Sequence, residues 1–149
     1  MELLDSIKTK ISEISEIKYI DENWGQLDYY SAHPPVQWPC CLIDISDIQF
    51  TNIGIDREKK PINRQMGNCL VKITIANIKL TNTSQRAPIG QKQDAWKVWR
   101  LIEQLHEKIH TFVPVENASP MIRQNLQRTL RDDGVQEYTI TYKTEIQNV

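Results

Sequence analysis

The sequence predicts an α+β fold, in which a single mostly antiparallel sheet carries two amphipathic helices packed on one face. Apolar residues recur at helical spacing in two segments, residues 3–17 and 94–112. Alternating apolar and polar residues predict a long hairpin at residues 40–80 and a C-terminal hairpin near the end of the chain. The 149 residues, of which 40% are hydrophobic and 25% charged, fit a single domain, 1–149.

The segment Asp94–Phe112 predicts the central helix, which is expected to lie across the sheet. Asp94 is a candidate N-cap, because its side-chain oxygen can accept a hydrogen bond from an amide of the first turn. Pro114 is expected to stop the helix. The residues that share its apolar face are Val98, Leu101, Ile102, Leu105, Ile109 and Phe112. The same spacing predicts a first helix of about four turns, with an apolar face of Leu3, Leu4, Ile7, Ile11, Ile14 and Ile17.

The segment Tyr19–Pro39 shows no clean period and combines aromatic residues with glycine and prolines. Within it, Gln26–Tyr30 is long enough to form a short strand. The aromatic residues have two interpretations: they cap the end of the core, or they form an exposed contact surface for a partner. These residues are Trp24, Tyr29, Tyr30 and Trp38.

A long antiparallel hairpin is predicted by Cys40–Thr51 and Cys69–Leu80, which alternate apolar and polar side chains. In the first strand the alternation slips by one residue, which predicts a β-bulge near Ser46 and Asp47. The connection 52–68 is polar, and we expect it to project beyond the body of the domain as a hairpin loop.

The clearest strand is Val135–Ile146, where apolar and polar residues alternate throughout. Asp132–Gly134 predicts a hairpin turn before it, because the glycine can take a positive φ. Residues 121–131 fit either a helix or a strand, and Leu126–Arg131 is the favoured hairpin partner.

Charge and composition exclude several classes of function. The net charge of −1 argues against a nucleic-acid binder that relies on a basic field, and no apolar run is long enough for a membrane span. The N-terminus has acidic residues where a signal peptide needs basic ones, so we expect the protein to stay in the cytoplasm. Cys40, Cys41 and Cys69 have no metal-binding or disulfide spacing and are expected to be reduced thiols packed in the core.

One enzyme signature lies in the central helix. His106, Glu107 and His110 match the H-E-x-x-H pattern, in which two imidazoles share a zinc ion and the glutamate acts on bound water. Lys108 places a charge inside the motif, the longer metzincin pattern is not continued, and His33 is too remote in sequence to be an evident third ligand. We therefore interpret the motif as polar residues that flank the apolar face of the helix, and expect no metal, cofactor or catalytic residue.

The order of elements carries a resemblance to a known family. An N-terminal amphipathic helix is followed by the entry segment 29–36 (YYSAHPPV), the long hairpin 40–80, the central helix 94–112 and a closing strand with the pattern Tyr-x-Ile-x-Tyr at 138–142. This order resembles the tail terminator and tail-completion (minor tail) proteins of long-tailed bacteriophages and prophages. The resemblance covers nearly the whole chain and is one of pattern, without a diagnostic residue motif.

The resemblance implies a structural protein and not an enzyme. It implies a hexameric ring, built from subunits that can be monomeric in solution, which caps the tail tube, ends tube growth and joins the tail to the head. The implied partners are further copies of the chain, the tail-tube protein and a head-completion protein, with no membrane and no specific nucleic acid. The implied locations are the host cytoplasm during assembly and the tail or neck of the virion.

The candidate interface residues follow from the expected shape of the projecting loop, whose tip could contact a neighbouring subunit or line the ring lumen. They are Asp56, Arg57, Glu58, Lys59, Lys60 and Arg64. A head–tail connector or neck protein is the alternative within the phage class. A small zinc-dependent hydrolase that uses His106, Glu107 and His110, and a generic α+β binding module, are the alternatives from other classes.

Overall fold

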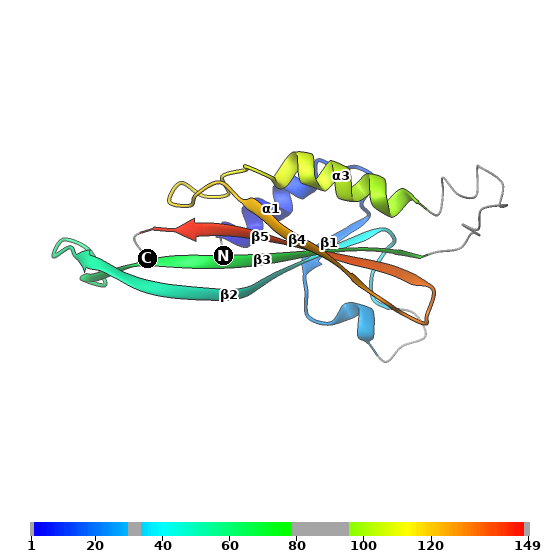
Figure 1. The fold of residues 1–149 in the computed structure, drawn as a ribbon, viewed down its shortest axis with the longest axis horizontal. Coiled ribbons are helices and arrows are strands. Elements are labelled where there is room, and N and C mark those ends of the chain that lie inside the picture. Colours follow the sequence, from blue (N-terminus) through cyan, green and yellow to red (C-terminus); the bar gives the residue numbers. More distant parts are fainter. Residues whose placement is uncertain (1, 30–33, 79–95, 148–149) are drawn as a thin grey trace.

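The computed structural model describes residues 2–29, 34–78 and 96–147. Two helices lie on one face of a five-stranded sheet with the strand order β1-β2-β3-β5-β4 (Figure 1). The elements are α1 (Glu2–Ile11), β1 (Tyr19–Glu22), the 3-10 helix η1 (Gln26–Asp28), β2 (Cys40–Ile55), β3 (Asn63–Ile78), α3 (Lys97–Ile109), β4 (Ile122–Thr129) and β5 (Val135–Ile146). All strand pairs are antiparallel except β1 with β2. The predicted α+β fold class is therefore confirmed.

The main core lies between the two helices and the sheet. Its fully buried side chains include Ile7, Ile11, Leu101, Leu105 and Ile109 from the helices and Ile43, Val71, Ile73, Ile75 and Tyr142 from the strands. These residues come from the apolar faces that the sequence periodicity predicted. Burial of those faces against each other supplies the driving force that holds the helices on the sheet.

Both helices are shorter than predicted. The first helix ends at Ile11, because Ser12 donates its hydroxyl to the carbonyl oxygen of Thr9 and the chain continues in tight turns. Ile14 and Ile17 remain buried through those turns.

The central helix ends at Ile109 because the chain next pairs with the segment before β4. The amide of Thr111 donates to the carbonyl of Met121 at 2.6 Å, and the amide of Met121 donates to the carbonyl of Phe112 at 2.9 Å. The predicted cap Asp94 lies outside the described residues, and Trp96 stands at the N-cap of α3 without a side-chain cap.

The long hairpin shows the predicted bulge, as a register shift between Ile45 and Asp47. Its strands extend farther than expected, however, because β2 continues to Ile55 and β3 begins at Asn63. Much of the segment 52–68, predicted as a loop, is therefore a strand ribbon that only a short turn connects. Charged and turn-forming residues fill much of this segment, and its three isoleucines are too few to mark two strands by alternation.

The C-terminal hairpin follows the prediction closely. β5 spans the predicted residues, and Gly134 in the turn has a φ of 79°. β4 starts four residues before the predicted Leu126, at Ile122, and all its side chains are exposed. It is an edge strand, so no apolar alternation marked where it begins.

A second, smaller core lies on the sheet face opposite α1 and α3 (Figure 1). It contains Leu27, Cys40, Leu42 and Ala76, with Tyr19, Val36, Trp38 and Val135 packed around them. The short strand predicted at Gln26–Tyr30 is wrong, because this segment begins with the 3-10 helix η1. The buried Gln26 side chain accepts from the amide of Trp24 and donates to the carbonyl of Glu22, which ties this turn to the end of β1.

None of the helices among the described residues is both long and apolar enough to cross a membrane.

Candidate interaction surfaces

The distal part of the β2–β3 hairpin, residues 50–66, forms a projecting ribbon that we call the arm. β1 pairs with β2 only as far as Ile43, and β5 pairs with β3 only from Gly67 onward. Among the described residues, the two strands of the arm therefore pair only with each other. Figure 1 shows the arm extending past the ends of α1 and β5, at the left of the view. An isolated two-stranded ribbon is marginally stable in water, so this part of the sheet lacks the support that the body has.

The six candidate interface residues all lie in the outer half of the arm. Asp56 organises the turn, since its carboxylate accepts from the amide of Glu58 at 3.1 Å and its amide donates to the carbonyl of Ile62 at 2.9 Å. Arg64 lies on β3 and donates to the carbonyl of Pro61 at 3.2 Å. Arg57, Glu58, Lys59 and Lys60 are exposed. Four cationic and two anionic side chains give the arm a net charge of +2.

Sequence reasoning missed the apolar residues of the arm. Phe50, Ile53, Ile55 and Ile62 expose 54%, 49%, 66% and 50% of their surface. Four large apolar side chains on one exposed ribbon are typical of a contact surface, whereas single exposed ones are ordinary. The signal was present in the sequence, because the stretch 50–62 interrupts its polar residues with three isoleucines.

The apolar surface of the arm continues that of the core. Ile48 packs against the main core, and Phe50 follows it on the same face of β2. A Cβ atom added to Gly67 would lie 2.9 Å from Cγ2 of Ile48 and 3.1 Å from Cε1 of Phe50, so both side chains lie against this glycine. The glycine thus lets the apolar strip run without a break from the covered sheet onto the uncovered arm.

The H-E-x-x-H motif lies near the C-terminal end of α3. The rings of His106 and His110 stack with their centroids 4.5 Å apart. Nδ1 of His110 accepts from the amide of Arg123 at 3.2 Å, and Nδ1 of His106 lies 3.5 Å from the hydroxyl of Tyr142. Burial, with the nearby Arg123, lowers the pKa of His106 below its usual range. These contacts give the two rings a structural part in joining α3 to β4 and β5.

No third ligand joins these histidines in the described part of the chain. Within it, no group of three or more His, Cys, Asp or Glu side chains is placed to hold a metal ion. Glu107 is exposed, and His33 lies outside the described residues. The arrangement gives no support to the zinc-dependent hydrolase alternative.

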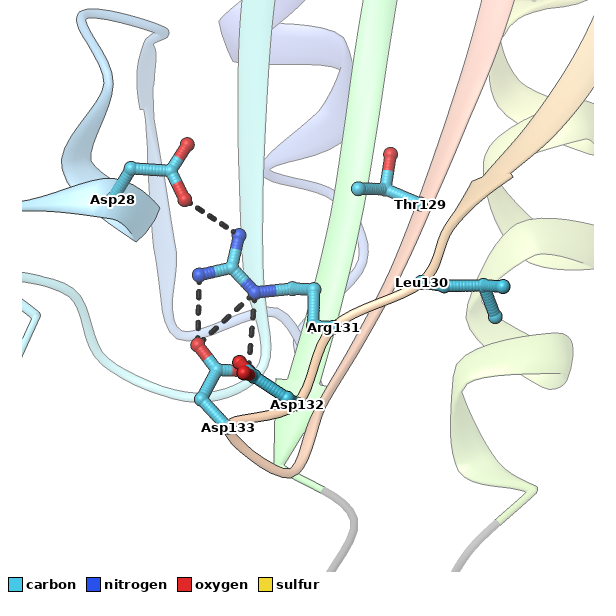
Figure 2. A pocket seen from close by; sticks show the side chains of 6 residues that line it. All are labelled: Asp28, Thr129, Leu130, Arg131, Asp132 and Asp133. Carbon is cyan, nitrogen blue, oxygen red and sulfur yellow. Dashed lines mark hydrogen bonds and ion pairs between the residues drawn. The ribbon is translucent and has the colours of Figure 1, made fainter.

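Arg131 forms a polar cluster at the end of the C-terminal hairpin, and sequence reasoning did not single it out. Its guanidinium donates to Asp133 at 2.7 Å, to Asp28 and Glu137 at 2.9 Å, and to the carbonyl of Leu27 at 2.8 Å. Figure 2 shows this arginine between Asp28 and Asp133, in an open hollow that Leu130 and Asp132 also line. The signal in the sequence was an arginine directly before the acidic turn.

The Arg131 cluster is a structural clamp. Hydrogen bonds from Arg131 lower the pKa of the Asp133 carboxyl. In turn, the carboxylates of Asp133, Glu137 and Asp28 raise the pKa of the Arg131 guanidinium. The side chain of Arg131 is only 11% exposed although that of Asp28 is 80% exposed. The cluster therefore fastens η1 and the small core to the turn between β4 and β5.

The three cysteines are all buried, as expected for packed thiols. Burial raises the pKa of Cys40 to about 12 and that of Cys69 to about 11, and it raises the pKa of Cys41 as well. A thiol with a raised pKa is a poor nucleophile, so this environment does not activate any of the three.

Of the aromatic residues in the segment Tyr19–Pro39, some pack at the core and others are exposed, so each of the two interpretations holds for part of them. Trp38 packs partly into the small core. Trp24 and Tyr29 are more than half exposed and meet edge-to-face, with centroids 5.8 Å apart. Tyr30 lies outside the described residues.

Comparison with known proteins gives a likeness at the level of the fold. No protein-family model matches the chain, and no curated protein matches its sequence. Among solved structures, it is similar to a chain in the virion of a native gene transfer agent particle, with 6% sequence identity and a TM-score of 0.51. The match covers 99% of this chain and 96% of that one. The two chains therefore share a fold over their whole lengths.

Proposed function

We propose that this protein is a structural component of a bacteriophage or prophage virion. On this proposal it forms a ring that caps the tail tube, ends tube growth and joins the tail to the head. The observation that carries the proposal is the whole-length fold similarity to a chain of a gene transfer agent virion. The resemblance of the element order to tail terminator proteins also points to a structural protein of a phage-like particle.

The arm supports a function in assembly. It places exposed apolar and charged side chains on a ribbon that reaches beyond the body of the domain. Such a ribbon can be covered only by another chain or another segment, and covering it would stabilise the complex through apolar burial. The proposed partners are further copies of this chain in a hexameric ring, the tail-tube protein and a head-completion protein, with assembly in the host cytoplasm.

The test removes the arm without disturbing the body. Residues 53–64 are replaced by Asn-Gly, a two-residue hairpin turn that joins the paired residues Asn52 and Gln65. The variant and the wild type are each mixed with purified tail-tube protein and examined by electron microscopy. We expect rings on tube ends with the wild type only, while circular dichroism and urea unfolding show that the variant remains folded.

Three outcomes would contradict the proposal or a part of it. If the wild type does not bind tube ends, the function in tail capping is wrong. If, in a parallel mixture with purified head-completion protein, it binds that protein but not tube ends, the alternative of a head–tail connector or neck protein replaces it. Equal ring formation by the shortened variant would exclude the arm from assembly.

A further inference from the structure

We infer that the arm of one copy docks on the outer end of the C-terminal hairpin of a second copy, with its apolar strip against Leu130 and its basic tip against the acidic side chains there. This inference rests on the proposed function, because it names the contact between neighbouring subunits.

The arm needs a partner that is both apolar and acidic. Its exposed apolar side chains are Phe50, Ile53, Ile55 and Ile62, and its net charge is +2. The whole chain has a net charge of −1, so the rest of the chain carries −1 − 2 = −3. Outside its own arm, a second copy therefore carries a net charge opposite in sign to that of the arm. Complementary charges of this kind direct association and fix its register.

The hollow beside Arg131 meets both requirements. Leu130 lines it and is 79% exposed, more than any other large apolar side chain among the described residues. Asp28, Asp132 and Asp133 line it and contribute three negative charges against the one positive charge of Arg131. The hollow therefore has a net charge of −2. Asp28 and Asp132 are exposed and can meet a lysine from outside.

The two surfaces lie at opposite ends of the molecule. In Figure 1 the arm reaches to the left, and the turn between β4 and β5 lies at the right. The arm of one copy therefore cannot reach its own hollow and has to use that of another copy. A contact between two different surfaces is heterologous, and repeating it generates a ring if the rotation closes.

Charge reversal on each surface separately tests the contact. One variant carries Lys59→Glu and Lys60→Glu on the arm, and the other carries Asp28→Lys and Asp132→Lys at the hollow. Each variant alone would place like charges opposite each other, so we expect its self-association to weaken about tenfold or more at low salt. In an equimolar mixture every arm meets a hollow of opposite charge. We expect association of the mixture to return to within about threefold of the wild type, measured by sedimentation velocity at concentrations high enough for the wild type to associate. A wild type that stays monomeric even there would overturn the inference.

A matched control reverses charge elsewhere, with Glu103→Lys on the exposed side of α3. It is expected to leave self-association unchanged. Failure of the mixture to recover would overturn the inference, as would an equal loss in the control. Asp28 also pairs with Arg131, so urea unfolding of the hollow variant checks that it is folded.

A cross-link provides a measurement that does not depend on that variant. A photoreactive phenylalanine analogue replaces Ile55 in the otherwise native chain, the variant is irradiated with purified tail-tube protein present, and mass spectrometry maps the cross-linked products. Cross-links to residues 128–133 of a second copy support the inference. Cross-links only to tail-tube protein would overturn it and leave the tail function intact. Self-cross-links at this site in a protein that does not bind tail tubes would support the inference and contradict the proposed function.

Discussion

The body of the domain and its arm use the same two strands for different purposes. Ile43 and Ile73 lie in β2 and β3 under the helices and are fully buried. Ile55, on the same β2 strand farther out, is 66% exposed. The residue type is the same, but in the body β1 and β5 flank the two strands and the helices cover them, whereas among the described residues the arm strands pair only with each other. The comparison teaches that the body stabilises the fold, whereas the arm leaves apolar side chains exposed, as the proposed contact with another chain requires.

Matched truncations of isoleucine should separate the two regions most strongly. Ile73→Ala would leave a cavity in the main core and is expected to lower the free energy of unfolding by about 3 kcal/mol. Ile55→Ala removes the same atoms from the exposed arm and is expected to change it by less than about 0.5 kcal/mol. Urea unfolding at neutral pH measures both. Similar losses in the two variants would show that the arm is part of the folded core.

Arg131→Met would test the polar clamp of the body, with an expected loss of about 2 kcal/mol. The methionine keeps much of the aliphatic length but leaves Glu137 and the carbonyl of Leu27 without their donor. The loss should stay below the roughly 3–5 kcal/mol that it costs to remove one partner of a fully buried ion pair, because the carboxylates of Asp28 and Asp133 can be solvated instead. The matched change Asp28→Asn, at the most exposed partner, should cost less than about 0.5 kcal/mol. If both variants unfold at the same urea concentration, the clamp contributes little.

Gly67→Ala would test the junction between body and arm, with an expected loss of about 1 kcal/mol. The added methyl group would press on Ile48 and Phe50, and the covered side of the junction has less room to adjust than the exposed side. In a Phe50→Ala background the cost should fall, because one of the two obstructing side chains is gone. A double-mutant cycle of unfolding free energies measures the difference. If Gly67→Ala lowers the free energy of unfolding equally in both backgrounds, Ile48 in the body and not Phe50 is the side chain that obstructs the added methyl group.

The same comparison explains which parts of the fold could be predicted from the sequence. Periodicity located β5 and the apolar faces of both helices, because burial on one side imposes a pattern on the residues. It failed for the outer ends of β2 and β3 and for the start of β4, where both sides are exposed and no pattern is required. β1, only four residues long, was hidden among aromatic and proline residues.

The candidate site was predicted in outline only. The sequence indicated a projecting charged tip, and the structure places all six of its candidate residues in the outer half of the arm. It did not show that Phe50 and Ile55 would be left uncovered, since exposure depends on where the helices stop. The sequence also could not predict the ion pair between Asp28 and Arg131, because these two residues are far apart in the chain and meet only in the folded sheet.

The smallest expected effect is a pH dependence that belongs to the body. The pKa of His106 lies below its ordinary 6.5 in the folded protein, mainly because burial disfavours the charged ring. The unfolded chain therefore binds more protons than the folded one between the two pKa values, and stability rises with pH there. The contribution is complete above pH 6.5 and is lost as the pH falls through the folded-state value. Urea unfolding between pH 7.5 and 5.5 should show a smaller decline in His106→Gln, whereas Ile55→Ala should keep the wild-type decline because the arm lacks this group.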